Sequence, residues 1–145
     1  MTNTKSPGDQ WKVALSIAKP RPLPIPRGGV PTDPGVYIWY RDGHPIYVGE
    51  ALGAEGLRGR LRKHFAKGRD LSRSTLRASV AAAQLGVPRS VARQRPSVMT
   101  VEQVAVVNQW LADCELGWIQ CDGIKEAHEW ELSLRGEWLP PLNLV

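Results

Sequence analysis

Two tyrosines in one β-prone stretch carry phenols that could take part in proton transfer. In GVYIWYRDGHPIYVGEA, residues 35–51, Tyr37 and Tyr47 each lie close to a glycine, on either side of a turn sequence. Because strand side chains alternate between the faces of a sheet, a two-residue turn would direct these phenols apart. We expect a three-residue loop that ends at a left-handed Gly43, which places Tyr37 opposite Tyr47 and Trp39 on the same face. The hairpin alone favours the interpretation that both tyrosines are ordinary strand aromatics without a catalytic role.

A guanidinium and an imidazole follow in LRGRLRKHF, residues 57–65, which has the pattern of an amphipathic helix. Arg60 and His64 are one turn apart on the same edge of its apolar stripe. A nearby cation disfavours protonation of an imidazole, so we expect His64 to be available as a neutral base. A hydrogen-bonded structural histidine is the alternative.

Four glutamates lie in IKEAHEWELSLRGEW, residues 124–138, and the predicted helix singles out one of them. At about 100° per residue, Glu131 lies beside the apolar stripe, roughly 40° from Ala127, and the other three lie farther round the helix. A carboxylate on a buried face is costly unless a cation compensates its charge. Glu131 is therefore expected either to hold a metal ion or to pair with an arginine or lysine inside the fold.

The elements that must position these residues are short strands and helices. Alternating, β-prone sequences predict strands over residues 35–41, 45–49 and 116–121. Helices are expected over residues 57–67, 74–86, 100–114 and 124–138. Ser74 is a suitable N-cap and Gly86 a suitable C-cap, and Thr100 and Gln103 have capping-box spacing. This order predicts an α+β fold, in which an antiparallel sheet is flanked by helices.

Residues 1–34 are rich in proline and are expected to form an N-terminal arm before one domain, residues 35–145. The stretch KPRPLPIPRGGVPTDPG cannot propagate a helix or pair as a central strand. It is expected to be an extended strap or a loose arm, which Trp11 pins to the body.

The chain of 145 residues has a formal net charge of +5, and this charge is unevenly distributed. Residues 56–101 hold eleven cations and one acid, whereas residues 102–145 hold two cations and eight acids. This basic region favours a polyanion as the partner, although a solvated surface also fits the charge. The residues predicted to bind nucleic acid are Arg58, Arg62, Lys63, Lys67, Arg73, Arg77, Arg89, Arg93 and Arg95.

Two further predictions concern the basic region and the compartment. SVAAAQLGVPRSVARQR fits either a helix-turn-helix that reads a DNA groove or a basic cap that contacts only phosphates, and we favour the cap. Two cysteines and the lack of a run of membrane-spanning length predict a cytoplasmic protein with reduced, buried thiols and no membrane contact.

Taken together, the motifs resemble those of the GIY-YIG endonucleases. GVY and IYVG match the two half-motifs, LRGRLRKHF matches the arginine helix, and EWELSLRGEWLPPLN matches the end of the catalytic module. The resemblance implies a small three-stranded antiparallel sheet flanked by helices. Residues 66–100 have no clear counterpart in the minimal module of the family, and we expect them to form a basic helical insert. Glu50 stands where many relatives carry lysine. Carried over position by position, the implied catalytic residues are Tyr37, Tyr47, Arg60, His64, Glu131 and Asn143.

The activity implied by the resemblance is metal-dependent hydrolysis of DNA phosphodiester bonds. Glu131 would hold one Mg²⁺ or Mn²⁺ ion, because water and phosphate oxygens can complete the ligand shell of a hard cation. Arg60 would contact the phosphate, and Tyr37 acting with His64 would activate water. A tyrosine base needs a lowered pKa, and Arg60 with the metal would supply part of that shift. Asn143 is expected to anchor the chain end rather than to react.

Two other functions stay open at this stage. One is a catalytically inactive nucleic-acid-binding module of the same fold, and the other is a structural protein whose charge split drives self-association. Every reactive position is present, which favours the enzyme. The resemblance favours DNA over RNA. The sequence leaves open the structure of the substrate, a role in DNA repair or restriction, and whether the protein forms a homodimer that cuts both strands.

Overall fold

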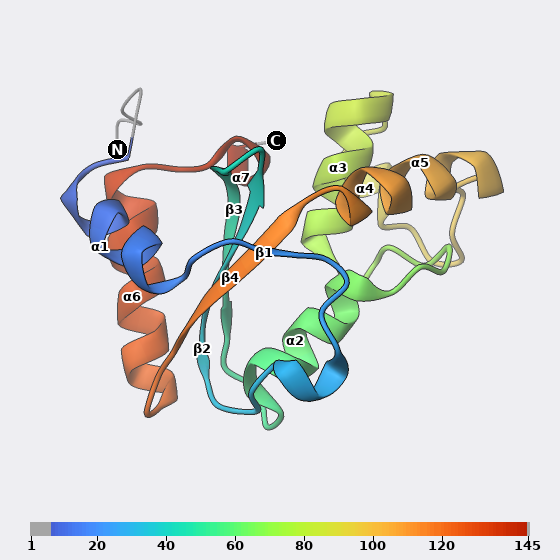
Figure 1. The fold of residues 1–145 in the computed structure, drawn as a ribbon. Helices are drawn as coiled ribbons and strands as arrows, with labels where there is room; N and C mark the ends of the chain where they lie inside the picture. Colours follow the sequence, from blue (N-terminus) through green and yellow to red (C-terminus); the bar gives the residue numbers. More distant parts are fainter. Residues whose placement is uncertain (1–6, 145) are drawn as a thin grey trace.

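The computed structural model describes residues 7–144, apart from the side chain of Arg27 (Figure 1). Its strands are β1 (Arg21–Pro22), β2 (Gly35–Arg41), β3 (His44–Ala51) and β4 (Glu115–Gln120). Its helices are α1 (Asp9–Ile17), α2 (Gly56–Phe65), α3 (Thr75–Leu85), α4 (Arg89–Ala92), α5 (Val101–Ala112), α6 (Ile124–Glu137) and α7 (Pro141–Leu144), with a 3₁₀ turn at Arg27–Gly29. The predicted α+β class is confirmed.

The sheet is antiparallel and has the strand order β1-β4-β2-β3. The prediction of three strands was wrong by one, because the proline-rich arm supplies β1. Arg21 and Pro22 pair with Leu116 and Glu115 of β4 at the edge of the sheet. A proline has no amide hydrogen to donate, so an edge is the position at which a strand tolerates it.

Helices cover both faces of the sheet, with α1 and α6 on one side and α2, α3 and α5 on the other (Figure 1). The even-numbered residues 36–40 of β2 pack toward α1 and α6. Tyr37 and Trp39 pack toward the opposite helices. Trp11 of α1 is fully buried and its indole donates to the carbonyl of Leu134 over 2.9 Å. Trp11 therefore fixes residues 9–17 to the body, as predicted, but these residues form α1, whereas no helix was expected in the N-terminal arm.

The β2–β3 hairpin differs from the prediction in its loop and in its register, because Tyr37 pairs with Gly49 and not with Tyr47, but the two tyrosines share one face with Trp39 as predicted. Residues 42–43 form a two-residue turn with φ values of 52° and 79°, the backbone of a type I′ turn, so the predicted three-residue loop was wrong. A β-bulge at Ile46 offsets the shorter loop, because Trp39 pairs with Tyr47. Tyr37 and Tyr47 consequently share a face with Trp39.

The caps predicted from the sequence set both ends of α3 and the start of α5. Ser74 accepts a hydrogen bond from the backbone amide of Arg77, and Gly86 ends α3 in the left-handed conformation with φ 70°. Thr100 and Gln103 form the predicted capping box at the start of α5. By contrast, α4 is a single turn of four residues, which is too short for a helix that reads a DNA groove.

The two cysteines are buried free thiols, as predicted. Burial raises the pKa of Cys114 and of Cys121 to about 11, so neither is a reactive thiolate near neutral pH. Within residues 7–144, no helix combines the length and the apolar character that crossing a membrane requires.

Candidate active site

A chain of buried hydrogen bonds connects the sheet with α2 and α3. The hydroxyl of Tyr37 on β2 lies 2.7 Å from Nε2 of His64 on α2. Nδ1 of the same imidazole lies 2.7 Å from Oγ of Ser74, the N-cap of α3. These three residues are only 1%, 2% and 1% exposed, so solvent does not compete for the bonds. The phenol of Tyr37 is thereby held in one position.

Gly49 allows the ring of Tyr37 to lie across β3. Tyr37 and Gly49 are cross-strand partners, and a Cβ atom at Gly49 would overlap the phenol. The rings of Tyr37 and Tyr47 stack with their centroids 6.5 Å apart at an interplanar angle of 28°. Gly49, which is near Tyr47 in the sequence, thus makes room for Tyr37 on the other strand.

Arg60 lies one turn before His64 on α2, and its positive charge acts on the Tyr37 phenol. Its side chain is half-buried, and no ion pair to a carboxylate involves it within residues 7–144. A guanidinium has five N–H donors in a planar fork. Arg60 therefore retains donors for an anion that approaches Tyr37.

Burial determines the protonation state of these groups. Burial raises the pKa of Tyr37 well above its usual value, and the pKa of Tyr47 also rises. Arg60 lowers the pKa of both phenols, as expected, but the net direction is upward because burial has the larger effect. Burial, followed by the charge of Arg60, lowers the pKa of His64 to about 3. His64 is therefore neutral at pH 7, as predicted.

Glu131 on α6 is half-buried, and its charge raises the pKa of both Tyr37 and Tyr47. Burial, followed by the charge of Glu50, raises the pKa of Glu131 itself. No ion pair involves Glu131 in the part of the chain that the structure describes. The internal salt bridge that the sequence left open for this residue is thus not formed among residues 7–144.

Glu50 and His128 form a pair beside Glu131 that sequence reasoning missed. Nδ1 of His128 lies 2.9 Å from Oε2 of Glu50, and this hydrogen bond raises the pKa of the imidazole. The two residues are 78 positions apart, and no sequence signal connects them. Ser74 was missed in a similar way, because its sequence signal predicts a helix cap and gives no indication of the contact with His64.

Asn143 connects α7 to the outer edge of β3. Its Oδ1 accepts from the amide of Val48 over 2.9 Å, and its Nδ2 donates to the carbonyl of Val48 over 3.0 Å. The side-chain amide thereby covers the edge of the sheet next to Tyr47. Both ends of the side-chain amide are engaged, so Asn143 anchors α7 to β3.

The cations that were predicted to bind nucleic acid lie in different environments, and the prediction for one of them was wrong. Arg77 is fully buried, and its guanidinium donates to the carbonyl of Gly68 and to Asn108. It cannot reach a nucleic acid, because the capped start of α3 directs it inward. The exposed members are Arg62, Lys63, Lys67, Arg73, Arg93 and Arg95, while Arg58 and Arg89 are half-buried.

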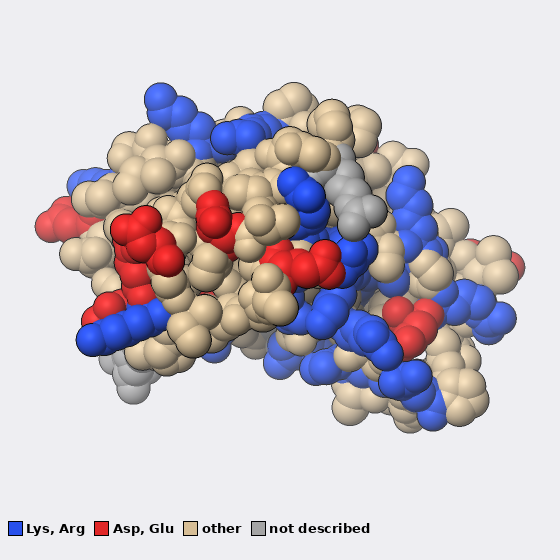
Figure 2. Space-filling model, turned by 90° about the horizontal axis from the view of Figure 1, so that it is seen from below, with Lys and Arg blue, Asp and Glu red and all other residues tan. Residues whose placement is uncertain are grey.

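The charge split of the sequence is visible on the surface. Figure 2 shows lysines and arginines mostly on the half of this face that carries α2, and acidic residues mostly on the half that carries α6. Some of the cations are paired: Arg62 binds Glu55 at 2.8 Å and Arg95 lies 3.9 Å from Asp70.

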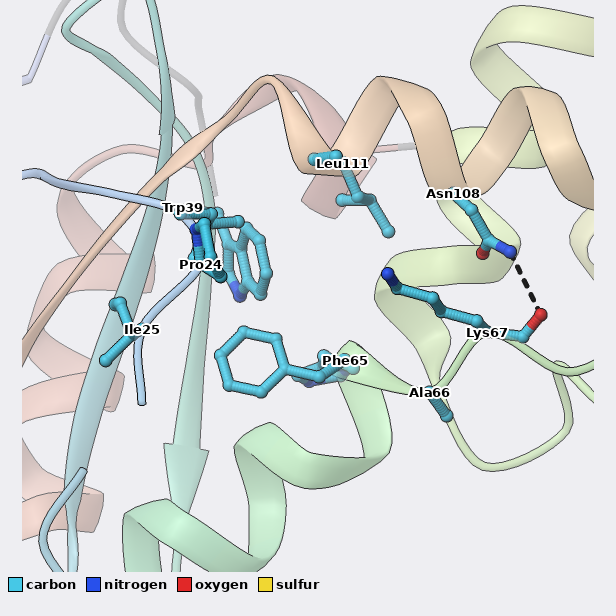
Figure 3. Close-up of a pocket in the computed structure, with 11 residues that line it drawn as sticks. Pro24, Ile25, Trp39, Phe65, Ala66, Lys67, Asn108 and Leu111 are labelled. Carbon is cyan, nitrogen blue, oxygen red and sulfur yellow. Dashed lines mark hydrogen bonds between the residues drawn. The ribbon is translucent and has the colours of Figure 1, made fainter. Parts of the chain in front are cut away.

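A cavity of about 360 Å³ lies beside His64, with mostly apolar walls (Figure 3). Trp39 and Phe65 line it together with Leu111, and Lys67 also contributes to its wall. The ring centroids of Trp39 and His64 are 6.4 Å apart. This apolar surrounding is one reason why His64 stays unprotonated.

The family model described as GIY-YIG catalytic domain matches residues 35–145. The chain therefore belongs to the GIY-YIG catalytic domain family, a family of nucleases, and the resemblance seen in the motifs is confirmed. No curated protein and no solved structure matches the chain.

Proposed function

We propose that this protein is a metal-dependent endonuclease that hydrolyses phosphodiester bonds in DNA. The observation that carries the proposal is the set of groups around β3: two phenols, a guanidinium with donors to spare and a carboxylate without an ion pair among residues 7–144. The phenol of Tyr37 is also hydrogen-bonded to a neutral imidazole. Membership of a nuclease family supports the same function.

Tyr37, acting with His64, activates the attacking water. Tyr37 acts as its phenolate, after its own proton has passed to solvent, and takes one proton from water as the water oxygen bonds to phosphorus. The 3′ oxygen leaves with the electron pair of the broken bond and takes a proton from solvent. The products carry a 5′-phosphate and a 3′-hydroxyl. Arg60 binds nonbridging phosphate oxygens next to the phenol, and Tyr47 hydrogen-bonds phosphate or water.

Glu131 is the residue that would hold the divalent metal ion that GIY-YIG nucleases generally use. Its raised pKa reflects burial and the nearby charge of Glu50, and a cation would relieve both. No group of three or more His, Cys, Asp or Glu side chains suited to a metal occurs among the described residues. Water and phosphate oxygens would therefore complete the shell, which suits Mg²⁺ or Mn²⁺. When bound, the ion would supply charge stabilisation at the leaving oxygen.

One observation favours a second candidate, a DNA-binding module without catalysis. Tyr37 is 1% exposed and burial raises its pKa, so in this conformation little of the phenol is accessible to water or DNA. The exposed cations on and after α2 would serve binding in either case.

A plasmid assay separates the two candidates. The nuclease predicts that supercoiled plasmid becomes open circular with Mg²⁺ or Mn²⁺ and stays intact with EDTA. Arg60→Ala, purified in parallel, controls for contaminating nucleases and should be inactive. Binding of a labelled duplex without cleavage of any DNA in a panel of linear, branched and single-stranded substrates would favour the binding module and contradict the nuclease.

A further inference from the structure

Ser74 belongs to the insert of residues 66–100, yet its hydroxyl contacts the imidazole of the candidate active site. We propose that Ser74 is a positioning residue that holds His64 in one neutral tautomer, with the proton on Nε2, so that His64 donates its hydrogen bond to Tyr37. This inference rests on the proposed function for its catalytic meaning, but the tautomer itself can be measured independently of activity.

The hydrogen bonds around Ser74 Oγ determine the direction of the bond. Two groups of the described residues lie within hydrogen-bonding distance of this oxygen: the backbone amide of Arg77 at 3.1 Å and Nδ1 of His64 at 2.7 Å. An amide can only donate, so it occupies a lone pair of Oγ. The single hydroxyl proton of buried Ser74 then has one available acceptor, Nδ1. If Nδ1 carried a proton instead, the hydroxyl proton would be left unpaired in the interior, which is costly.

The protonation of Nε2, the other ring nitrogen of His64, follows from this assignment. A neutral imidazole carries one ring proton, so an unprotonated Nδ1 puts that proton on Nε2. Nε2 then donates to the Tyr37 oxygen across the 2.7 Å contact. The positive charge of Arg60 also acts on this phenol. The oxygen of Tyr37 thus accepts from Nε2, which directs its own proton away from His64, and Nε2 and the charge of Arg60 both stabilise its phenolate form.

Ser74 is well suited to impose this arrangement because the fold fixes it twice. It is 1% exposed, and as the N-cap of α3 its side chain cannot rotate without breaking the bond to Arg77. The insert therefore has a part in the site through one hydroxyl, beyond the cations that it carries.

The direct test is ¹⁵N nuclear magnetic resonance of the imidazole nitrogens in the full chain at neutral pH. We expect His64 of the wild type to show a protonated Nε2 and an unprotonated Nδ1. We expect Ser74→Ala to shift the ring toward a tautomer mixture and Ser74→Thr, which keeps a hydroxyl, to restore the wild-type spectrum. Thr100→Ala removes a comparable helix cap far along the chain and should leave the His64 signals unchanged. A wild-type ring protonated on Nδ1 would overturn the proposal.

Nicking kinetics of the Ser74 variants test whether the position of His64 matters for catalysis. Ser74→Ala should lower kcat for plasmid nicking about tenfold or more with KM nearly unchanged, and Ser74→Thr should recover most of the rate. Thr100→Ala should nick as the wild type does. Equal rates for Ser74→Ala and wild type would contradict the positioning role. If the wild type does not nick DNA, the proposed function fails, while the spectrum still decides the tautomer.

Discussion

Tyr37 is the side chain on which the proposed chemistry depends most. Tyr37→Phe should lower the nicking rate by about 10² to 10⁴-fold, because it removes the proton acceptor and keeps the ring. The measurement is a single-turnover nicking rate. Tyr40→Phe is a matched control, since Tyr40 is another buried β2 tyrosine, on the opposite face, whose hydroxyl binds the carbonyl of Ala18. An undiminished rate for Tyr37→Phe would remove this residue from the mechanism.

His64 gives the protein a stability that depends on pH. The pKa of His64 is lowered to about 3 in the fold, so between about pH 6.5 and pH 3 the unfolded chain binds a proton that the folded chain does not. Stability conferred by neutral His64 is thus present above the unfolded pKa and is lost as pH falls. Urea unfolding should show a slope of up to about 1.4 kcal/mol per pH unit below pH 6.5.

The matched comparison for this prediction is His64→Gln, which retains a polar side chain without a titrating ring. Its free energy of unfolding should be lower at neutral pH and should fall less steeply below pH 6.5. The same slope in both proteins would mean that other groups, such as the carboxylates, cause the acid sensitivity.

Residue chemistry was predictable from sequence where a motif or a helical position singles out a side chain. The helical projection put Glu131 at the border of the apolar stripe, and the structure finds it half-buried. Arg77 could not be distinguished from the exposed cations, because a charge count does not show which way a side chain points. Ser74 and Glu50 act through partners that are distant in sequence or outside any motif, and only the fold brings these pairs together.

At the scale of elements, β3 is shaped by the tyrosine that lies across it. Gly49→Ala should destabilise the protein by about 1–3 kcal/mol and lower the nicking rate, because the added Cβ overlaps the phenol of Tyr37. Thermal unfolding and nicking measure the two effects. Gly53→Ala, in the loop after β3, meets no atom within 4 Å and should change neither. Equal behaviour of the two variants would show that the tyrosine adapts freely.

Elements were predictable where local chemistry decides them. The caps at Ser74, Gly86 and Thr100 depend on a few neighbouring residues, and all three formed as expected. The prediction of the hairpin loop was wrong. A two-residue turn with a bulge at Ile46 puts the two tyrosines on one face, as a three-residue loop without a bulge would, and the alternation of residues does not distinguish the two arrangements. Strand β1 was missed because two residues of a proline-rich segment carry no periodic signal.

At the scale of the whole molecule, the basic half should make DNA binding sensitive to salt. Lys63→Ala and Lys67→Ala should each reduce the slope of log K against log salt by about 0.9 if each lysine contacts one phosphate. Fluorescence anisotropy with a labelled duplex gives the slopes. Lys12→Ala on α1, where Lys12 lies 3.9 Å from Asp9, is the control and should leave the slope unchanged. If the Lys63→Ala and Lys67→Ala variants keep the wild-type slope, as Lys12→Ala does, the DNA does not contact these two lysines.

The central claim for the molecule is that groups from the sheet, α2 and α6 form one metal-dependent nuclease site around β3. The most direct measurement is the nicking rate of Glu131→Gln beside the wild type at saturating Mg²⁺, with DNA affinity measured on the same samples. The account predicts a rate at least about 100-fold lower at unchanged affinity, with a thermal stability equal to or above that of the wild type because the substitution removes a disfavoured charge. A Glu131→Gln variant that cuts at the wild-type rate would contradict it.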